Sequence, residues 1–132
     1  MKTTFLLIAT FLVIGCSKKM IETDSGLKYR ILKQGSGPQA KIGDEILLYE
    51  TTSYRNGTVL YSNYESTSPV KVLIGGNQAT QAVDEGLRGM RVGEIRELTA
   101  SPNLVKRKSY PSNVSPDSTL VIKMRLDKIL EK

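Results

Sequence analysis

Cys16 is the only thiol in this chain of 132 residues, and histidine occurs nowhere in it. Imidazole is the base of Ser-His and Cys-His catalysis and a common zinc ligand, so its absence excludes these kinds of site. A single cysteine also excludes an intrachain disulfide and a cysteine cluster that binds a metal. Any chemistry must therefore work without an imidazole, and we expect neither a metal nor a cofactor.

Two short segments carry residue types that suit anions. Gly75 and Gly76 precede a helical pattern, but the glycine spacing and the Lys-Ser/Thr pair of a phosphate-binding loop are missing. The basic run 106–108 would suit an anionic lipid or another polyanion, although runs this short are usually solvated loop. Neither segment defines a function by itself.

The N-terminal stretch has the layout of a secretory signal. An apolar run over 5–14 follows Lys2 and is shorter than the ~20 residues that a membrane-spanning helix needs. It ends in Val-Ile-Gly-Cys at Cys16, which resembles the lipobox of bacterial lipoproteins, in which the cysteine is lipidated and becomes the first residue. The alternative is a chance cysteine after an ordinary signal peptide.

The lipobox resemblance implies a signal peptide over 1–15 and a lipidated tether over 16–24, with acyl chains such as palmitate on Cys16. It places the protein at a bacterial cell envelope, at the outer membrane or the periplasmic face. The formal net charge of +6, one unit of it from Lys2 in the removed segment, suits an anionic envelope surface. We expect no nucleic-acid partner, because the lipobox resemblance implies export.

The stretch 75–100 predicts one short helix followed by a strand. Its apolar residues recur at helical spacing, at Ala79, Ala82, Val83, Leu87 and Met90. Asn77 is a candidate N-cap, and Gly89 supplies a left-handed stop. We expect this to be the only helix, with its apolar face packed against a sheet.

Every other periodic segment predicts a strand. The strands are expected over 27–31, 46–52, 58–62, 70–74, 95–100 and 120–127. Asn56-Gly57 favours a tight hairpin turn between two of them. The long irregular stretch 102–118 is the kind of loop that is often functional. The expected fold class is α+β, with one short α-helix across a strongly twisted, mostly antiparallel sheet.

Three motifs in this order carry a family resemblance. They are Gly-Leu-Lys-Tyr-Arg-Ile-Leu-Lys-Gln-Gly-Ser-Gly over 26–37, Val-Asp-Glu-Gly-Leu-Arg-Gly-Met-Arg-Val-Gly-Glu over 83–94, and Val-Ser-Pro-Asp-Ser-Thr-Leu-Val-Ile over 114–122. Together they resemble the FKBP family of peptidyl-prolyl cis-trans isomerases. The resemblance implies an FKBP-like domain over 25–132 that acts on proline-containing polypeptides and assists the folding of exported proteins. We expect this domain to be a monomer.

The resemblance also implies the pocket. It assigns Tyr49 to the pocket wall and Val83 to the floor, where the family usually has tryptophan. The catalytic positions that it implies are Tyr49, Leu60, Tyr61, Val70, Val83 and Ile122. The substrate-binding positions are Gln78, Ala79, Thr80, Lys106 and Val114, and the N–H of Thr80 is a candidate donor to the substrate carbonyl. Tyr49 is otherwise a core strand residue, and Tyr61 either refills the pocket or is exposed.

Prolyl isomerisation is compatible with the composition. The X-Pro bond rotates over a barrier of ~18–20 kcal/mol because of its partial double-bond character, and no nucleophile or proton transfer is needed. An apolar pocket and positioned donors favour the twisted transition state. The aliphatic pocket leaves a second hypothesis open, in which the chain is a weakly active or inactive lipoprotein that keeps the fold as a binding or scaffold module.

Overall fold

A computed structural model describes residues 18–66 and 68–132, so the expected signal peptide and Cys16 lie outside the described residues. The strands are β1 (Ile21–Glu22), β2 (Lys28–Lys33), β3 (Glu45–Tyr54), β4 (Val59–Ser62), β5 (Val70–Leu73), β6 (Ile95–Ala100) and β7 (Leu120–Ile129). The helices are α1 (Gln81–Leu87) and a short 3-10 helix, η1 (Pro102–Leu104).

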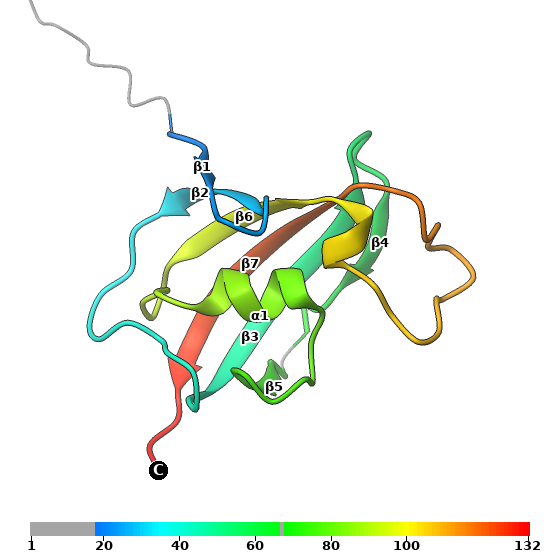
Figure 1. Ribbon diagram of the computed structural model, residues 1–132. Helices are drawn as coiled ribbons and strands as arrows, with labels where there is room; N and C mark the ends of the chain where they lie inside the picture. The colour runs from blue at the N-terminus through cyan, green and yellow to red at the C-terminus, as the bar shows by residue number, and fades with distance from the viewer. Residues whose placement is uncertain (1–17, 67) are drawn as a thin grey trace, which may run out of the picture.

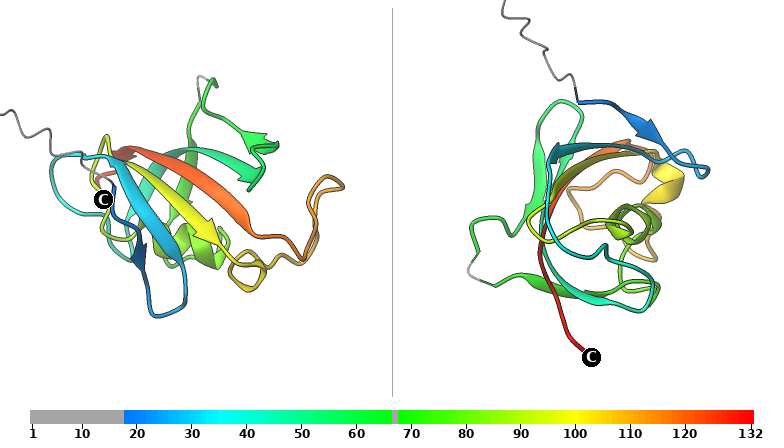
Figure 2. Two further views of the ribbon diagram at one scale, coloured as in Figure 1. Left: turned by 90° about the horizontal axis from the view of Figure 1, so that it is seen from above. Right: turned by 90° about the vertical axis from the view of Figure 1, so that its left-hand side faces the viewer.

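The strands form one antiparallel sheet in the order β1-β2-β6-β7-β3-β4, and β5 pairs with β3 at the opposite end from β4. The long central strands β3 and β7 pair along most of their length. Figure 1 shows α1 lying across one face of this sheet. In Figure 2 the sheet curves around the helix, so the helix is enclosed on several sides. The predicted fold class is confirmed.

The core lies between α1 and the sheet. The helix buries Ala82, Val83 and Leu87 against the sheet residues Leu98 and Met124. Contact is close enough that a methyl group added at Gly86 would lie 2.6 Å from a Leu98 methyl carbon. Glycine at this position therefore lets the helix approach the sheet.

The ends of α1 differ in part from the sequence prediction. Thr80 is the N-cap, and the predicted cap Asn77 instead lies in the preceding loop with φ of 58°. Gly89 has φ of 84°, which confirms it as the left-handed stop. The Arg96 guanidinium donates to the carbonyl oxygens of Gly86 and Arg88, each at 3.2 Å, and so satisfies the C-terminal end of the helix.

The N-terminal segment contributes a strand that the sequence pattern did not predict. β1 pairs with β2 through Ile21 and Tyr29, within the stretch for which a tether was expected. Thr23 and Ser25, which follow β1, donate hydrogen bonds to the Glu85 carboxylate on α1. Within residues 18–66 and 68–132 no helix is long and apolar enough to cross a membrane.

Candidate functional site

An open hollow of about 540 Å³ lies between α1, β3, β5 and the loop that follows η1. It is lined by Leu48 and Glu50 of β3, Val70 and Val72 of β5, residues 77–80 and Val83 around the start of α1, and residues 106–108 of the loop. A second hollow of about 290 Å³ adjoins it and shares Glu50 and Arg107. The two hollows together form one depression.

Part of the wall of the first hollow is aliphatic. Val72 and Val83 are 6% and 7% exposed, whereas Val70 on the outer wall is 44% exposed. These aliphatic side chains can remove water from a small apolar ring without ordering a flexible group. The hollow therefore suits an apolar residue such as proline.

Thr80 stands at the start of α1 and faces this hollow. Its hydroxyl oxygen is buried and has no hydrogen-bond partner among the described residues. As the N-cap, Thr80 accepts the first helical hydrogen bond, from the N–H of Asp84 at 3.0 Å. Neither the backbone nor the side-chain hydrogen bonds found within 18–66 and 68–132 use the N–H of Thr80. That N–H is free to donate to a ligand.

The loop that leads into α1 is held by side chains of its neighbours. The Asp84 carboxylate accepts hydrogen bonds from the N–H of Gly75 at 2.7 Å and from Arg88 at 2.8 Å. The Gln78 side-chain oxygen accepts a hydrogen bond from the N–H of Leu73 at 2.9 Å. These bonds fix the end of β5 to the helix, and so position Thr80 in the hollow.

Glu50 places a carboxyl in the wall of the hollow. Its backbone N–H donates to the Asn63 side-chain oxygen at 2.7 Å, and the Asn63 side-chain nitrogen donates to the Leu48 carbonyl at 3.1 Å. One carboxylate oxygen of Glu50 is buried without a hydrogen-bond partner among the described residues. Burial raises the pKa of this carboxyl, and the Arg107 guanidinium opposes that shift.

Tyr49 lies on the opposite face of the sheet, which corrects its predicted place in the pocket wall. The Arg125 guanidinium lies 4.6 Å from the centre of its ring, and the ring of Tyr64 lies 6.5 Å away. Successive strand residues point to opposite faces, and Leu48 and Glu50 face the hollow. The β3 residues in the pocket wall are therefore Leu48 and Glu50.

Most other predicted site residues lie around the two hollows. The first hollow is lined by Val70, Gln78, Ala79, Thr80, Val83 and Lys106. The second is lined by Leu60, Tyr61 and Val114. The 46% exposure of Tyr61 shows that it does not refill the interior. Ile122 is corrected: it is 2% exposed in the core and lines neither hollow, although its sheet partner Thr52 lines the second one.

The contacts that hold the loop beside the hollow were not predicted from the sequence. The Tyr54 hydroxyl donates to the Asn113 carbonyl at 2.8 Å and accepts from the N–H of Ser115 at 2.9 Å. The Asn113 side chain donates to the Leu60 carbonyl at 3.1 Å. Glu50 was missed too, although the alternation of buried Ile46 and Leu48 along β3 signals an inward position two residues further on.

This arrangement can bind and desolvate a peptide but offers little other chemistry. Within the described parts of the chain, no three His, Cys, Asp or Glu residues are grouped as they would be in a metal site. The candidate groups for a substrate are the aliphatic walls, the N–H of Thr80, the Glu50 carboxyl and the cations of the loop. Such a site stabilises a twisted amide by its surroundings rather than by bond making.

A sheet curved around one short helix, with an apolar hollow beside the helix start, defines an FKBP-like domain. Two solved structures have this fold: FkpA from Escherichia coli, with a TM-score of 0.73 and 23% identity over 83% of this chain and 51% of that one; and AtFKBP13, with a TM-score of 0.72 and 22% identity over 85% of this chain and 99% of that one.

Sequence relationships specify the family. Residues 37–127 match the family model of the FKBP-type peptidyl-prolyl cis-trans isomerase. FK506-binding protein 2 of Yarrowia lipolytica is 30% identical over 86% of this chain and 80% of its own length. FK506-binding protein 1 of Dictyostelium discoideum is 29% identical over 76% of this chain and 95% of its own length. The chain belongs to the FKBP family of peptidyl-prolyl cis-trans isomerases, as its three motifs indicated, and its substrates are proline-containing polypeptides.

Proposed function

We propose that this isomerase uses the first hollow to assist the folding of exported proteins at a bacterial cell envelope. The observation that carries the catalytic part is the N–H of Thr80, which has no hydrogen-bond partner among the described residues and stands beside aliphatic side chains. An apolar surface and a backbone donor in one depression are what a rotating X-Pro bond requires. The protein acts as a monomer, since one domain supplies both features.

The hollow lowers the barrier by changing the surroundings of the amide. Water stabilises the charge-separated resonance form of a planar amide, so its removal by Val70, Val72 and Val83 favours the twisted form. The N–H of Thr80 then donates to the substrate carbonyl in its rotated position, which adds binding that is present only in the transition state. Neither effect depends on proton transfer.

The two adjoining hollows suit a peptide rather than an isolated ring. The first, larger hollow receives the proline, and the second receives a neighbouring side chain between Leu60 and Val114. Arg107 and Glu50 stand at the boundary, because they line both. A bound segment therefore passes Glu50 and Arg107 between its proline and the neighbouring side chain.

A lipid on Cys16 holds the protein at the envelope in this proposal. The support is the positive start, apolar run and small residues that end at Cys16. Only residues 17–20 separate Cys16 from β1, a stretch that reaches roughly 14 Å when fully extended. The domain would thus stay close to the membrane surface.

Metabolic labelling with palmitate tests the anchor in a bacterium that expresses the full chain. The unsubstituted protein should carry the label and sediment with membranes. Cys16→Ser should lose the label and be released or left unprocessed, whereas Ser17→Ala, the neighbouring substitution, should retain it. Absence of label from the unsubstituted chain would contradict the lipid anchor without affecting the isomerase assignment.

The alternative is a catalytically weak binding or scaffold module. The observation that favours it is the buried Glu50 carboxyl beside the valines of the wall, since a carboxyl there is a poor surface for proline. Peptide binding without acceleration of cis-trans exchange would support this alternative. Binding together with acceleration would support the isomerase.

A further inference from the structure

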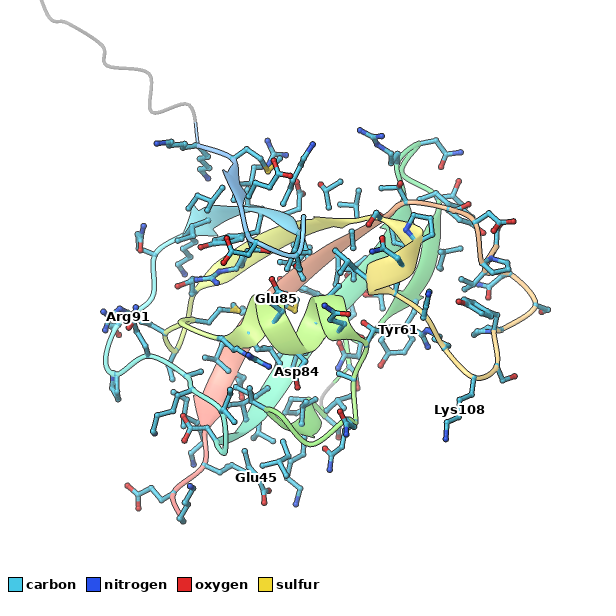
Figure 3. All side chains as sticks on the ribbon, viewed as in Figure 1. Glu45, Tyr61, Asp84, Glu85, Arg91 and Lys108 are labelled. Atoms are coloured by element: carbon cyan, nitrogen blue, oxygen red, sulfur yellow. The ribbon has the colours of Figure 1, made fainter. Side chains whose placement is uncertain are left out.

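Three adjacent cationic residues, Lys106, Arg107 and Lys108, line one side of the first hollow. All three are exposed, and Figure 3 shows Lys108 on the outer bend of the loop. None of the ion pairs found among residues 18–66 and 68–132 involves them. Their charges are therefore available to a bound molecule.

The loop that carries these cations is attached to the body of the protein. Tyr54 is hydrogen-bonded to the loop at Asn113 and Ser115. The N–H of Arg107 donates to the Tyr110 hydroxyl at 3.3 Å, which closes a turn within the loop. The cations consequently stand on the side of the hollow rather than on a free tail.

Glu50 is the acidic residue that lines the hollow, and it lies in the wall rather than on the rim. Glu50 and Arg107 both line the two hollows, and the positive charge of Arg107 lowers the pKa of the Glu50 carboxyl against the effect of burial. Lys106 and Lys108 have no ion-pair partner in the part of the chain that the structure describes, and both line the hollow. A second carboxylate inside the hollow would be repelled by Glu50, whereas a carboxylate at the rim would meet the two lysines.

We propose that the hollow prefers proline segments in which a residue next to the proline carries a carboxylate, and that Lys106 and Lys108 determine this preference. The inference rests on the proposed function only in taking the hollow as the proline site. Exposed ion pairs are weak individually, so two of them should favour an acidic over a neutral peptide by roughly fivefold at low salt. Salt should reduce the preference, because it screens exposed charges.

Matched short peptides provide the test. The set Ala-Xaa-Pro-Ala and Ala-Pro-Xaa-Ala, with Xaa as Glu, Gln or Lys, differs only in charge beside the proline. Binding is measured by NMR titration, and cis-trans exchange is measured by exchange spectroscopy on the same samples. In at least one of the two series, Glu should bind more tightly than Gln and Gln more tightly than Lys, with the differences shrinking as salt is raised.

Charge variants of the protein assign the preference to the loop. The double substitution Lys106→Gln and Lys108→Gln should bring the Glu and Gln peptides to equal affinity. Lys28→Gln with Lys33→Gln removes the same charge from exposed positions of β2, away from the hollow, and should leave the preference in place. Equal affinity of all the peptides for the unsubstituted protein, or a preference that survives the loop substitutions, would overturn the inference.

Three outcomes distinguish this inference from the isomerase mechanism and from membrane binding. If the peptides bind with the predicted preference but exchange no faster, the isomerase mechanism fails while the inference stands. If the loop substitutions leave peptide selectivity unchanged but weaken binding to phosphatidylglycerol vesicles, the lysines contact a membrane and the inference is wrong. Equal acceleration of exchange for the Glu, Gln and Lys peptides, with equal affinities, would retain the isomerase and reject the preference.

Discussion

Tyr49 and Glu50 are neighbours on β3, and their side chains lie on opposite faces of the sheet. The Tyr49 ring packs beneath the Arg125 guanidinium at 4.6 Å, whereas Glu50 forms part of the wall of both hollows. The strand thus presents an aromatic residue to the outer face and a carboxyl to the two hollows. This relationship determines which β3 substitutions should affect catalysis.

Substitutions of these two neighbours give the first prediction. Tyr49→Ala should leave kcat/KM within about twofold and destabilise the protein by roughly 1 kcal/mol through loss of the contact with Arg125. Glu50→Tyr should raise kcat/KM severalfold, because an aromatic wall adds roughly 0.5–1.5 kcal/mol of contact to a bound ring. A protease-free isomerisation assay and urea unfolding measure both. Loss of catalysis in the Tyr49 variant with Glu50 intact would contradict the site.

The outer wall of the hollow gives a second prediction. Val70→Ser should lower kcat/KM about fivefold, because roughly 1 kcal/mol of apolar contact with the proline ring is lost. The same substitution at Val59, a 58% exposed strand residue that lines neither hollow, is the matched control. Stability should change by less than about 0.5 kcal/mol in either variant. Equal kinetics for the two variants would remove Val70 from the site.

The hydrogen bonds of Tyr54 give a third prediction, about the loop. Tyr54→Phe should raise KM and speed amide hydrogen exchange at residues 113–115, with a loss of roughly 1 kcal/mol in stability. Tyr64→Phe is the control, because the Tyr64 hydroxyl is buried without a partner among the described residues. Its removal should be neutral or stabilising. Unchanged exchange in the Tyr54 variant would show that the loop is held by other contacts.

Glu50 gives a fourth prediction, about pH. Burial raises the pKa of this carboxyl and Arg107 partly offsets the effect, while Lys106 and Lys108 also face it across the hollow. Above the ordinary value of 4.5 the folded state keeps a proton that the unfolded state has released. The free energy of unfolding therefore falls as pH rises through this window, and the stability that is present below the ordinary pKa is lost above the raised one.

The substitution Glu50→Gln removes this slope. The stability difference between Glu50→Gln and the unsubstituted protein should grow as pH rises above about 4.5 and then level off. The pKa of Asp44 is lowered by hydrogen bonds from the Lys41 backbone and side chain, so this residue makes stability fall as the pH is lowered in acid. Both proteins contain Asp44, so its effect cancels in the difference. Urea unfolding at several pH values measures the difference, and exposed Glu131→Gln is the control. A constant difference would contradict the burial of the carboxyl.

Much of the fold was predictable from local pattern. The alternation along β7 and the helical spacing over 79–90 gave the strand and the helix, and Gly89 gave the end of the helix. β1 was not predictable, because Ile21–Glu22 is too short for a periodic signal and becomes a strand by pairing with β2. The start of α1 was misplaced because Asn77 is also a residue that tolerates a left-handed turn.

The site was less predictable than the fold. Residues around the start of α1 were found because the helix and its entry loop are continuous in sequence. The assignment of Tyr49 failed because it followed the residue type, an aromatic, and did not follow the alternation of faces along the strand. The contacts of Tyr54 with the loop join residues about sixty positions apart, and such pairs leave no local pattern.

The most direct test is NMR exchange spectroscopy on a proline peptide with micromolar protein. Cis-trans exchange should accelerate in proportion to protein concentration, and Val70→Ser should weaken this acceleration while Val59→Ser should not. Exchange that remains at its rate in buffer, with the protein folded and the peptide bound, would contradict the claim that this hollow lowers the barrier to prolyl rotation.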